Sequence, residues 1–215
     1  MKLMKPLKVK VSGDLALFTR PEGKVERVSY PIIPPSAARG VLEAIFWKPE
    51  IRWEILRIKV LKVPKYYSIV RNEVSKKAIV NKSIMENPKD YFADDDRQLR
   101  HSLMLKDVSY IIEAQIHMQP DAVDPVGKYR AIFRRRVEKG QCFHRPYLGT
   151  RECSAYFSLP DVDDTPIDWT DSLGPIFFDF RYPTKGSVTI PYFFNAEVKK
   201  GVMEIPTNLY REVNR

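Results

Sequence analysis

The most strongly patterned stretch of this chain runs from Val126 to Arg151 and reads VGKYRAIFRRRVEKGQCFHRPYLGTR. It follows Pro125, and nothing in it breaks a helix before Gly140, so it predicts a helix from residue 126 to residue 139. Apolar residues recur at spacings of three and four and give this helix one apolar face. These residues are Val126, Tyr129, Phe133 and Val137.

Most of the remaining helix surface is basic. From Lys128 to Arg145 there are seven Lys or Arg residues and one acid, Glu138, a local net charge of +6, whereas the whole chain carries +9. Three consecutive arginines cannot all be buried without partners, so we expect an anionic partner across the helix. The candidate phosphate contacts are Arg130, Arg134, Arg135, Arg136, Lys139, Arg145 and Tyr147, joined by Arg20, Lys24 and Arg27 of a proline-rich loop.

The composition is that of a globular protein with a basic surplus. The 215 residues are 44% hydrophobic and 29% charged, with 36 Lys and Arg against 27 Asp and Glu. This surplus favours a polyanionic partner, either nucleic acid or a membrane surface. No apolar run reaches the roughly 18 residues that a membrane span requires, and the N-terminus lacks the apolar core of a signal peptide. We therefore expect a cytoplasmic protein without a membrane partner.

The cysteine and histidine content leaves little room for a metal centre. The two cysteines, Cys142 and Cys153, are not in a CxxC arrangement, and a reducing compartment is the simpler expectation, although a disulfide between them stays open. The three histidines are His101, His117 and His144, too few for a histidine-based zinc site. We expect no metal and no other cofactor.

Alternation of polar and apolar residues predicts four main strands. They cover residues 7–12, 52–63, 108–118 and 153–159. A further helix is predicted from Ala37 to Trp47, with Ser36 as its N-cap after two prolines. The order is then β-α-β-β-α-β, which predicts an α+β protein with a ferredoxin-like, RRM-like fold.

The pattern is weaker between the second and third of these strands. Residues 66–71 and 74–80 predict a hairpin insertion that turns at Asn72 and Glu73. From residue 81 to residue 106 the pattern dissolves, which predicts a long loop.

The composition changes again at Asp161. Five acids and no base lie between residues 161 and 174, which is typical of a surface linker. Strand patterns at 176–182, 187–194 and 201–205, with turns at 183–186 and 199–201, predict a small antiparallel sheet. We therefore expect two domains, a ferredoxin-like domain over 1–160 and a linker with a small C-terminal sheet over 161–215.

Two kinds of nuclease chemistry can be read from the side chains. The trio Asp94, Asp95 and Asp96 could hold Mg²⁺, but it lacks a second acidic element at a recognisable spacing, and we favour a solvated acidic loop. Alternatively, a ferredoxin-like sheet with a basic helix and surface aromatics suits single-stranded RNA, whose 2′-hydroxyl is itself a nucleophile.

Cleavage by the 2′-hydroxyl without a metal needs a base, a cation for the phosphorane and an acid for the leaving oxygen. Lys128 is the candidate cation, and a lysine among arginines, whose charged form is disfavoured, could also act as a base. Tyr129 and His144 are candidate base or acid, because nearby cations favour the phenolate of a tyrosine. In the alternative reading, Tyr129 is a core residue and His144 bonds only a phosphate or the backbone.

Three blocks of the chain carry a family resemblance: residues 13–51, residues 105–114 (LKDVSYIIEA) and residues 127–153. Together they resemble the type I-C (Dvulg subtype) CRISPR-associated proteins of the fifth Cas family, in the RAMP superfamily. The resemblance implies a ferredoxin-like RAMP domain with a small C-terminal sheet. It also implies a metal-independent endoribonuclease that cuts CRISPR repeat RNA 3′ of the hairpin and keeps the 5′ handle as a subunit of the type I-C surveillance complex.

In members of this family the proposed catalytic set is a tyrosine at the end of the first helix and a Lys-His pair early in the second. These positions fall on Phe46, Lys128 and Tyr129, so only the lysine matches. Phe46 cannot donate or accept a proton, and His144 is the candidate acid or base that would replace the missing tyrosine. Two other functions stay open: a structural subunit that caps the crRNA without cutting it, and a general nucleic-acid-binding protein that also binds DNA non-specifically.

Overall fold

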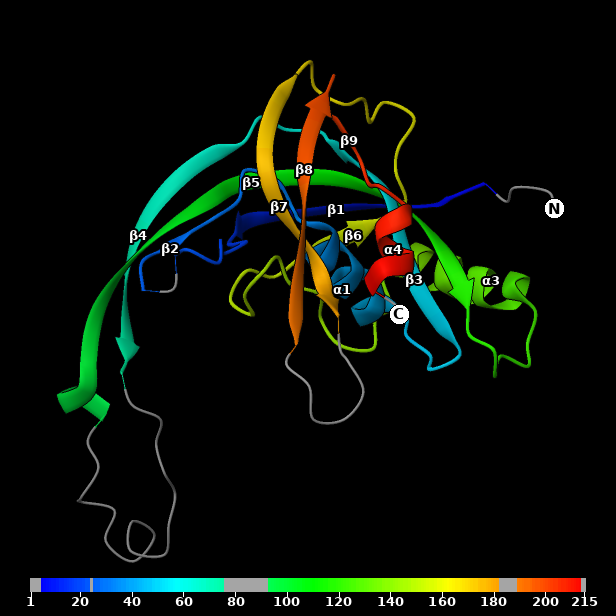
Figure 1. Ribbon diagram of the computed structural model, residues 1–215, viewed down its shortest axis with the longest axis horizontal. Helices are drawn as coiled ribbons and strands as arrows, with labels where there is room; N and C mark the ends of the chain where they lie inside the picture. Colours follow the sequence, from blue (N-terminus) through cyan, green and yellow to red (C-terminus); the bar gives the residue numbers. More distant parts are fainter. Residues whose placement is uncertain (1–4, 24, 76–92, 182–188, 214–215) are drawn as a thin grey trace, which may run out of the picture.

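The computed structural model describes residues 5–23, 25–75, 93–181 and 189–213 (Figure 1). In this part of the chain the backbone forms a nine-stranded sheet, and its spine is β5 (Arg97–Met118), a strand of 22 residues. The other elements are β1 (Leu7–Ala16), β2 (Arg27–Val28), α1 (Pro35–Ile45), β3 (Ile51–Val60), β4 (Lys65–Val74), the 3-10 turn η2 (Ala93–Asp96), α3 (Val126–Glu138), β6 (Tyr156–Ser158), β7 (Asp171–Arg181), β8 (Ile190–Lys199), β9 (Val202–Glu204) and α4 (Asn208–Val213).

The first part of the sheet has the expected ferredoxin-like plan. Four strands lie in the order β6-β1-β5-β3, and each neighbouring pair is antiparallel. The chain passes through α1 between β1 and β3 and through α3 between β5 and β6, which is the β-α-β-β-α-β connectivity. Figure 1 shows both helices on the same side of β1 and β5. The predicted fold class is therefore confirmed.

The core lies between this sheet and the two helices. Trp53 of β3 is fully buried, and its ring lies 4.6 Å from that of Phe133 on α3. The indole nitrogen of Trp53 donates a hydrogen bond of 2.9 Å to the carbonyl oxygen of Phe46, directly after α1. Because a buried indole N–H needs an acceptor, this bond fixes the end of α1 against β3.

Both predicted helices are present, with small differences at their ends. α3 begins after Pro125 and has Lys139 as its C-cap, and Gly140 follows with a φ of 64°, as the prediction of a helix stop required. α1 begins at Pro35, so Ser36 is inside its first turn, and no side chain caps it; the predicted N-cap is wrong. A proline is favourable at the first helical position because its fixed φ matches the helix. None of the helices among the described residues has the length and apolar character needed to cross a membrane.

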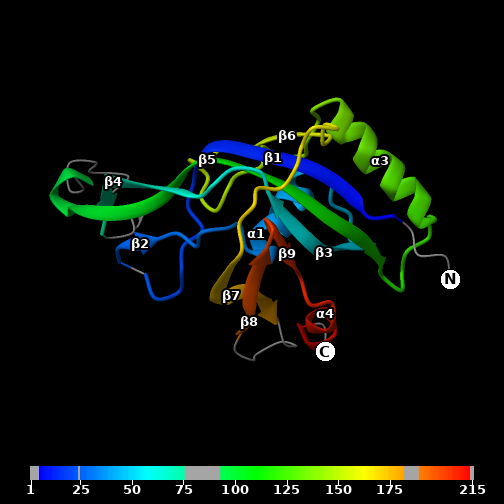
Figure 2. The same cartoon turned by 90° about the horizontal axis from the view of Figure 1, so that it is seen from above.

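The predicted hairpin at Asn72 and Glu73 is wrong. Both residues lie inside β4 and pair with Leu99 and Gln98 of β5. Residues 97–106, which were expected to be part of a long loop, form the first half of β5, and β4 and this half together make an arm that projects from the core (Figures 1 and 2). The expected strand residues 76–80 and loop residues 81–92 lie outside the described part.

The C-terminal strands are present and continue the same sheet. β9 pairs with β3 through Arg57 and Glu204, and β8 and β7 follow it. β7 begins at residue 171, inside the expected linker. Figure 2 shows β7 and β8 turned away from the plane of β1 and β5. The division of the chain at residue 160 into two domains stays a prediction, and the expected turn at 183–186 lies outside the described residues.

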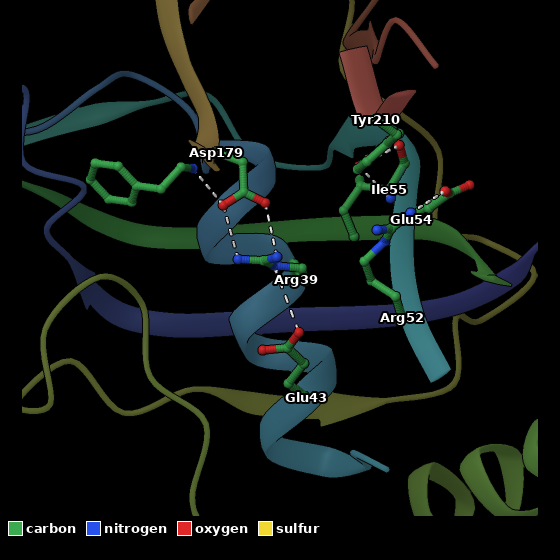
Figure 3. Close-up of polar contacts among 8 residues, drawn as sticks. Arg39, Glu43, Arg52, Glu54, Ile55, Asp179 and Tyr210 are labelled. Atoms are coloured by element: carbon green, nitrogen blue, oxygen red, sulfur yellow. Dashed lines mark hydrogen bonds and ion pairs between the residues drawn. The ribbon is translucent and has the colours of Figure 1, made fainter. Parts of the chain in front are cut away.

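The short helix α4 was not predicted from the sequence. Its Tyr210 lies against β3, where the hydroxyl accepts a hydrogen bond of 2.7 Å from the backbone nitrogen of Ile55 and donates one of 3.1 Å to its carbonyl oxygen (Figure 3). Because these bonds join a C-terminal element to the second strand of the ferredoxin-like plan, they reinforce the β3–β9 pairing.

Candidate nucleic-acid interface

The helix α3 divides its residues between a buried and an exposed face. Tyr129, Phe133 and Val137 are buried, so the predicted apolar face is confirmed. Arg134 and Arg135 point to solvent, and Arg134 forms an ion pair of 3.0 Å with Glu138, one turn later.

The basic residues of α3 have different partners within the protein. Arg136 donates a hydrogen bond of 2.7 Å to the carbonyl oxygen of Ile45, and its guanidinium group lies over the ring of Phe46. Arg130 donates to the carbonyl oxygen of Lys5. These two arginines therefore support the fold. Within the described residues, Arg135 and Lys139 are exposed and make no polar side-chain contact, so their charges are available to an anion.

Lys128 lies in the first turn of α3 with its ammonium group exposed. Its Nζ atom is 2.7 Å from an oxygen of Asp124, and this hydrogen bond raises the pKa of Lys128. The expectation that neighbouring arginines disfavour its charged form is wrong, because an acid is the nearer partner. Lys128 is a stable cation, which suits the stabilisation of negative charge and not the role of a base.

Tyr129, the next residue, faces the core. Its ring lies 6.4 Å from that of Phe46, and its hydroxyl donates a hydrogen bond of 3.2 Å to Glu50. Burial of the ring raises the pKa of Tyr129, and the charge of Glu50 raises it further. The expectation of a stabilised phenolate is therefore wrong, and this hydroxyl keeps its proton. Glu50 was not found from the sequence, because it meets Tyr129 only through the packing of α1 and α3.

Phe46 is buried at the C-terminal end of α1, while the next residue, Trp47, is 56% exposed. Phe46 contacts both Tyr129 and Arg136, so it fills the space between α1 and α3. It contributes packing at this position and no ionisable group.

The loop after α3 closes on the same end of α1. The backbone nitrogens of Phe143 and His144 both donate to the carbonyl oxygen of Ala44, at 2.9 Å and 3.3 Å. The side chain of His144 is exposed, and its ring lies 5.8 Å from that of Phe143. In the described part of the chain, no polar contact links His144 to Lys128. Each is connected to the end of α1 separately: the backbone of His144 bonds to Ala44, and Tyr129, the residue after Lys128, packs on Phe46.

His144 lines a pocket of about 570 Å³ between α1, the loop after α3 and β7. Its floor is a charged network (Figure 3): Arg39 of α1 forms two contacts of 2.9 Å with Asp179 of β7, and its Nε atom is 3.7 Å from Glu43. Burial raises the pKa values of both carboxyl groups, although Arg39 opposes the shift. Tyr147 also lines this pocket. Arg39, Glu43 and Asp179 were not singled out from the sequence: Arg39 and Glu43 are one turn apart on α1, and Asp179 meets Arg39 only when β7 packs on that helix.

The other candidate contacts lie elsewhere. Arg20 stacks over Tyr30 at 5.4 Å, and Arg27 of β2 forms an ion pair of 3.3 Å with Glu73 of the β4–β5 arm, so neither is beside α3. Arg145 lies over the ring of Tyr156, next to the pocket loop. Lys24 is outside the described residues.

Neither the acidic trio nor the two cysteines lie in a metal-binding group within the described residues. Residues 94–96 form the turn η2, where Asp94 is paired with Arg97 at 2.6 Å. In the part of the chain that the structure describes, no group of three or more His, Cys, Asp or Glu side chains could hold a metal ion. Cys142 is exposed, Cys153 is buried, and both are free thiols.

Fold and site together define a ferredoxin-like protein with a basic helical face. Residues 6–204 of the sequence match the model of the Cas5d family, described as CRISPR-associated protein (Cas_Cas5). The chain therefore belongs to the Cas5d family, and the resemblance seen in the three sequence blocks is confirmed.

Two curated relatives are similar along nearly their whole length. The chain is 46% identical to a CRISPR pre-crRNA endoribonuclease Cas5d of Thermus thermophilus, covering 99% of this chain and 96% of the relative. It is 42% identical to the protein of the same name from Mannheimia succiniciproducens, with 97% and 98% covered.

Two solved structures share the fold. A functionally uncharacterized protein from Streptococcus mutans has a TM-score of 0.68 at 21% identity, with 95% of this chain and 94% of that chain covered. A CRISPR-associated protein has a TM-score of 0.67 at 24% identity, with 94% and 92% covered.

Proposed function

We propose that this protein is an endoribonuclease that cleaves CRISPR repeat RNA and keeps the 5′ handle of the product as a subunit of a type I-C surveillance complex. The observation that carries the proposal is the 46% identity, over 99% of the chain, with a relative named a CRISPR pre-crRNA endoribonuclease. The basic face of α3 supports it, because exposed Lys and Arg side chains can pair with the backbone phosphates of an RNA substrate.

The proposed reaction needs no metal ion. The 2′-oxygen of the RNA attacks the adjacent phosphorus, and the bond from phosphorus to the 5′-oxygen breaks, which leaves a 2′,3′-cyclic phosphate and a free 5′-hydroxyl. A base takes the proton of the 2′-hydroxyl, and an acid supplies one to the leaving oxygen. The exposed ammonium group of Lys128 stabilises the extra negative charge of the phosphorane.

The two proton carriers are assigned from their surroundings. Tyr129 is the proposed acid, because its hydroxyl carries a proton at neutral pH, and Glu50, which accepts a hydrogen bond from it, fixes the direction of that hydroxyl. His144 is exposed on the loop beside α1 and is the proposed base. Phe46 takes no part in proton transfer. Arg134, Arg135, Lys139 and Arg145 are the proposed phosphate contacts.

We also place the protein in the cytoplasm. Both cysteines are free, and Cys142 is exposed, which fits a compartment that keeps thiols reduced.

The decisive experiment incubates the purified protein with end-labelled repeat RNA in excess EDTA, beside a substrate with a 2′-deoxy sugar at the cut site. We expect one cut that survives EDTA and is absent from the deoxy substrate. A cut that EDTA abolishes would contradict the metal-free reaction, and a cut in the deoxy substrate would contradict 2′-hydroxyl attack.

A second function is favoured by the two departures from the family's catalytic set, Phe46 and Tyr129. If the protein binds the hairpin tightly without cutting it, it is a crRNA-capping structural subunit. Equal competition by scrambled RNA or by DNA would instead indicate a general nucleic-acid-binding protein.

A further inference from the structure

The pocket between α1, the loop after α3 and β7 is surrounded by exposed aromatic side chains. Trp47 lies just after α1, Phe143 and Tyr147 belong to the loop, and Phe180 lies near the end of β7; their exposed fractions are 56%, 82%, 39% and 39%. Large exposed aromatics gathered at one concave site are typical of a ligand surface, because apolar area left in water is unfavourable. The volume of about 570 Å³ lies within the range of small-ligand pockets.

The floor of the pocket offers hydrogen-bond acceptors. Arg39 is held by Asp179, which uses both carboxylate oxygens in contacts of 2.9 Å (Figure 3). Within the part of the chain that the structure describes, Glu43, on the next turn of α1, has one polar side-chain contact, 3.7 Å from the Nε atom of Arg39, which is longer than a hydrogen bond. Among the described residues, no hydrogen bond therefore occupies the carboxylate of Glu43, which has capacity to accept hydrogen bonds from a ligand in the pocket.

Gly40 opens the wall of the pocket between these two residues. It lies in the interior of α1, where glycine is less favourable than alanine. A Cβ atom at this position would meet nothing within 4 Å, so packing inside the protein does not require the glycine. Its absence of a side chain leaves a flat strip of helix backbone, against which a planar ring can lie.

We infer that this pocket binds one unpaired guanine base of an RNA strand. The aromatic side chains supply stacking faces, and the Glu43 carboxylate accepts two parallel hydrogen bonds from the N1–H and the exocyclic amine of guanine. Guanine fits best because it presents two adjacent N–H donors on one edge, which match the two oxygens of a carboxylate. This inference rests on the proposed function, since it names a base of the same RNA substrate.

The position of the pocket relative to Lys128 supports a shared RNA strand. The pocket loop is bonded to Ala44, and the side chain of Phe46, two residues later, contacts the residue next to Lys128. A strand whose base enters the pocket can therefore continue past the C-terminal end of α1 toward Lys128. Arg145 is an exposed cation of the pocket loop and is the proposed phosphate contact of that strand.

The first test measures binding of hexaribonucleotides of uridine that carry one central guanosine, inosine, adenosine, cytidine or abasic site. We expect the guanosine hexamer to bind about tenfold tighter than the abasic one, as stacking of one base predicts, with inosine between them because it lacks the exocyclic amine. Equal affinity across the series would overturn the inference.

The fluorescence of Trp47 reports whether the base enters this pocket. Trp53 is buried and Trp169 is partly buried, so the guanosine hexamer should quench mainly Trp47, and Trp47→Phe should remove the quenching. Quenching that persists in Trp47→Phe would place the base elsewhere and contradict the inference.

Two variants test the chemistry of the pocket. Glu43→Gln should abolish the preference for guanosine, whereas Glu197→Gln, on exposed β8, should keep it. Gly40→Leu should fill the wall and lower the affinity of the guanosine hexamer to that of the abasic one, even if Glu43→Gln fails to fold. If both pocket variants keep the preference, the inference is wrong. A normal guanosine preference without cleavage of repeat RNA would instead contradict only the proposed enzyme activity.

Discussion

Glu113 lies on β5 with its side chain 2% exposed, between cationic side chains of both neighbouring strands. Lys59 of β3 contacts one carboxylate oxygen at 2.8 Å, and Lys8 of β1 contacts the same oxygen at 3.3 Å. Arg57 reaches the other oxygen at 3.5 Å. Burial alone would raise the pKa of Glu113, but the lysines outweigh it, and the pKa is lowered. This carboxylate therefore joins three strands electrostatically.

We expect Glu113→Gln to lower the free energy of unfolding at pH 7 by about 1–3 kcal/mol, because three cations lose their partner. A carboxyl group whose pKa is lowered by folding stabilises the protein above its unfolded pKa of about 4.3, and this stabilisation is lost as the pH falls through the folded pKa. The difference between the variant and the parent should therefore shrink toward pH 3. Urea unfolding at both pH values measures it.

The matched control is Glu197→Gln, whose exposed carboxylate pairs with Lys199 on β8, and which should change little. A Glu113→Gln difference of the same size at pH 7 and pH 3 would show that shape and not charge is responsible.

Lys128 permits a second prediction at the scale of a residue. Lys128→Ala should lower the rate of repeat-RNA cleavage by about 10²–10³-fold with little change in affinity, as for the loss of a donor that acts on the transition state. Single-turnover rates and binding constants measure the two quantities separately. Lys128→Arg, which keeps the positive charge, should retain more of the rate than Lys128→Ala. A loss of affinity equal to the loss of rate would make Lys128 a binding residue only.

At the scale of elements, the sequence pattern predicts those helices and strands that have one buried side. In α3 the residues Tyr129, Phe133 and Val137 are buried at helical spacing, so the pattern is visible. The arm formed by β4 and the first half of β5 is mostly exposed on both faces, so no periodicity marks residues 97–106 as a strand. Their strand structure comes from the ladder of pairs between Lys65–Lys106 and Val74–Arg97.

The candidate site divides in the same way. His144 and Tyr147 could be singled out because a histidine and a tyrosine follow a basic helix. Glu43 is one turn from Arg39 on α1, and nothing local shows that it lines a pocket, which forms only when the loop after α3 and β7 pack on that helix. Glu50 and Asp179 could not be singled out either, because each gains its partner through contacts between segments that are distant in the sequence. Pairings of this kind carry no local signal.

The glycine inside helix α1 gives a prediction about stability. Gly40→Ala should raise the free energy of unfolding by about 0.5–1 kcal/mol, because alanine restricts the unfolded chain and meets no atom in the helix surroundings. Thermal unfolding should show a melting temperature higher by about 1–4 °C, because 1 kcal/mol shifts it by about 2–4 °C at this chain length. Gly149→Ala is the opposite case: its φ is 91° and a Cβ would collide with the carbonyl oxygen of Leu17, so it should destabilise. A destabilised Gly40→Ala would show that α1 needs the glycine for folding.

At the scale of the whole molecule, the basic residues have two different uses. Arg130 and Arg136 bond to backbone carbonyls of Lys5 and Ile45, and so they hold α3 to the rest of the fold. Within the described residues, Arg135 and Lys139 have no such partner. The arginines of α3 are therefore not all equally available to RNA.

This division predicts how RNA binding depends on salt. Affinity should fall steeply as salt rises, because each phosphate contact releases condensed counterions, with a contribution to the log–log slope of about 0.7–0.9. The double variant Arg135→Gln and Lys139→Gln should therefore reduce the slope by about 1.4–1.8 and weaken binding to repeat and scrambled RNA alike. Filter binding or anisotropy over a salt series measures it.

Two comparisons make this measurement specific to the exposed face of α3. Lys199→Gln with Lys200→Gln removes two charges at the exposed β8–β9 turn and should leave the slope unchanged. Arg136→Gln should lower the melting temperature, because the carbonyl of Ile45 and the ring of Phe46 lose their cation. If Arg136→Gln changes the slope as much as the double variant while its stability stays normal, then Arg136 also contacts phosphate, and the separation of structural from RNA-binding arginines on α3 is wrong.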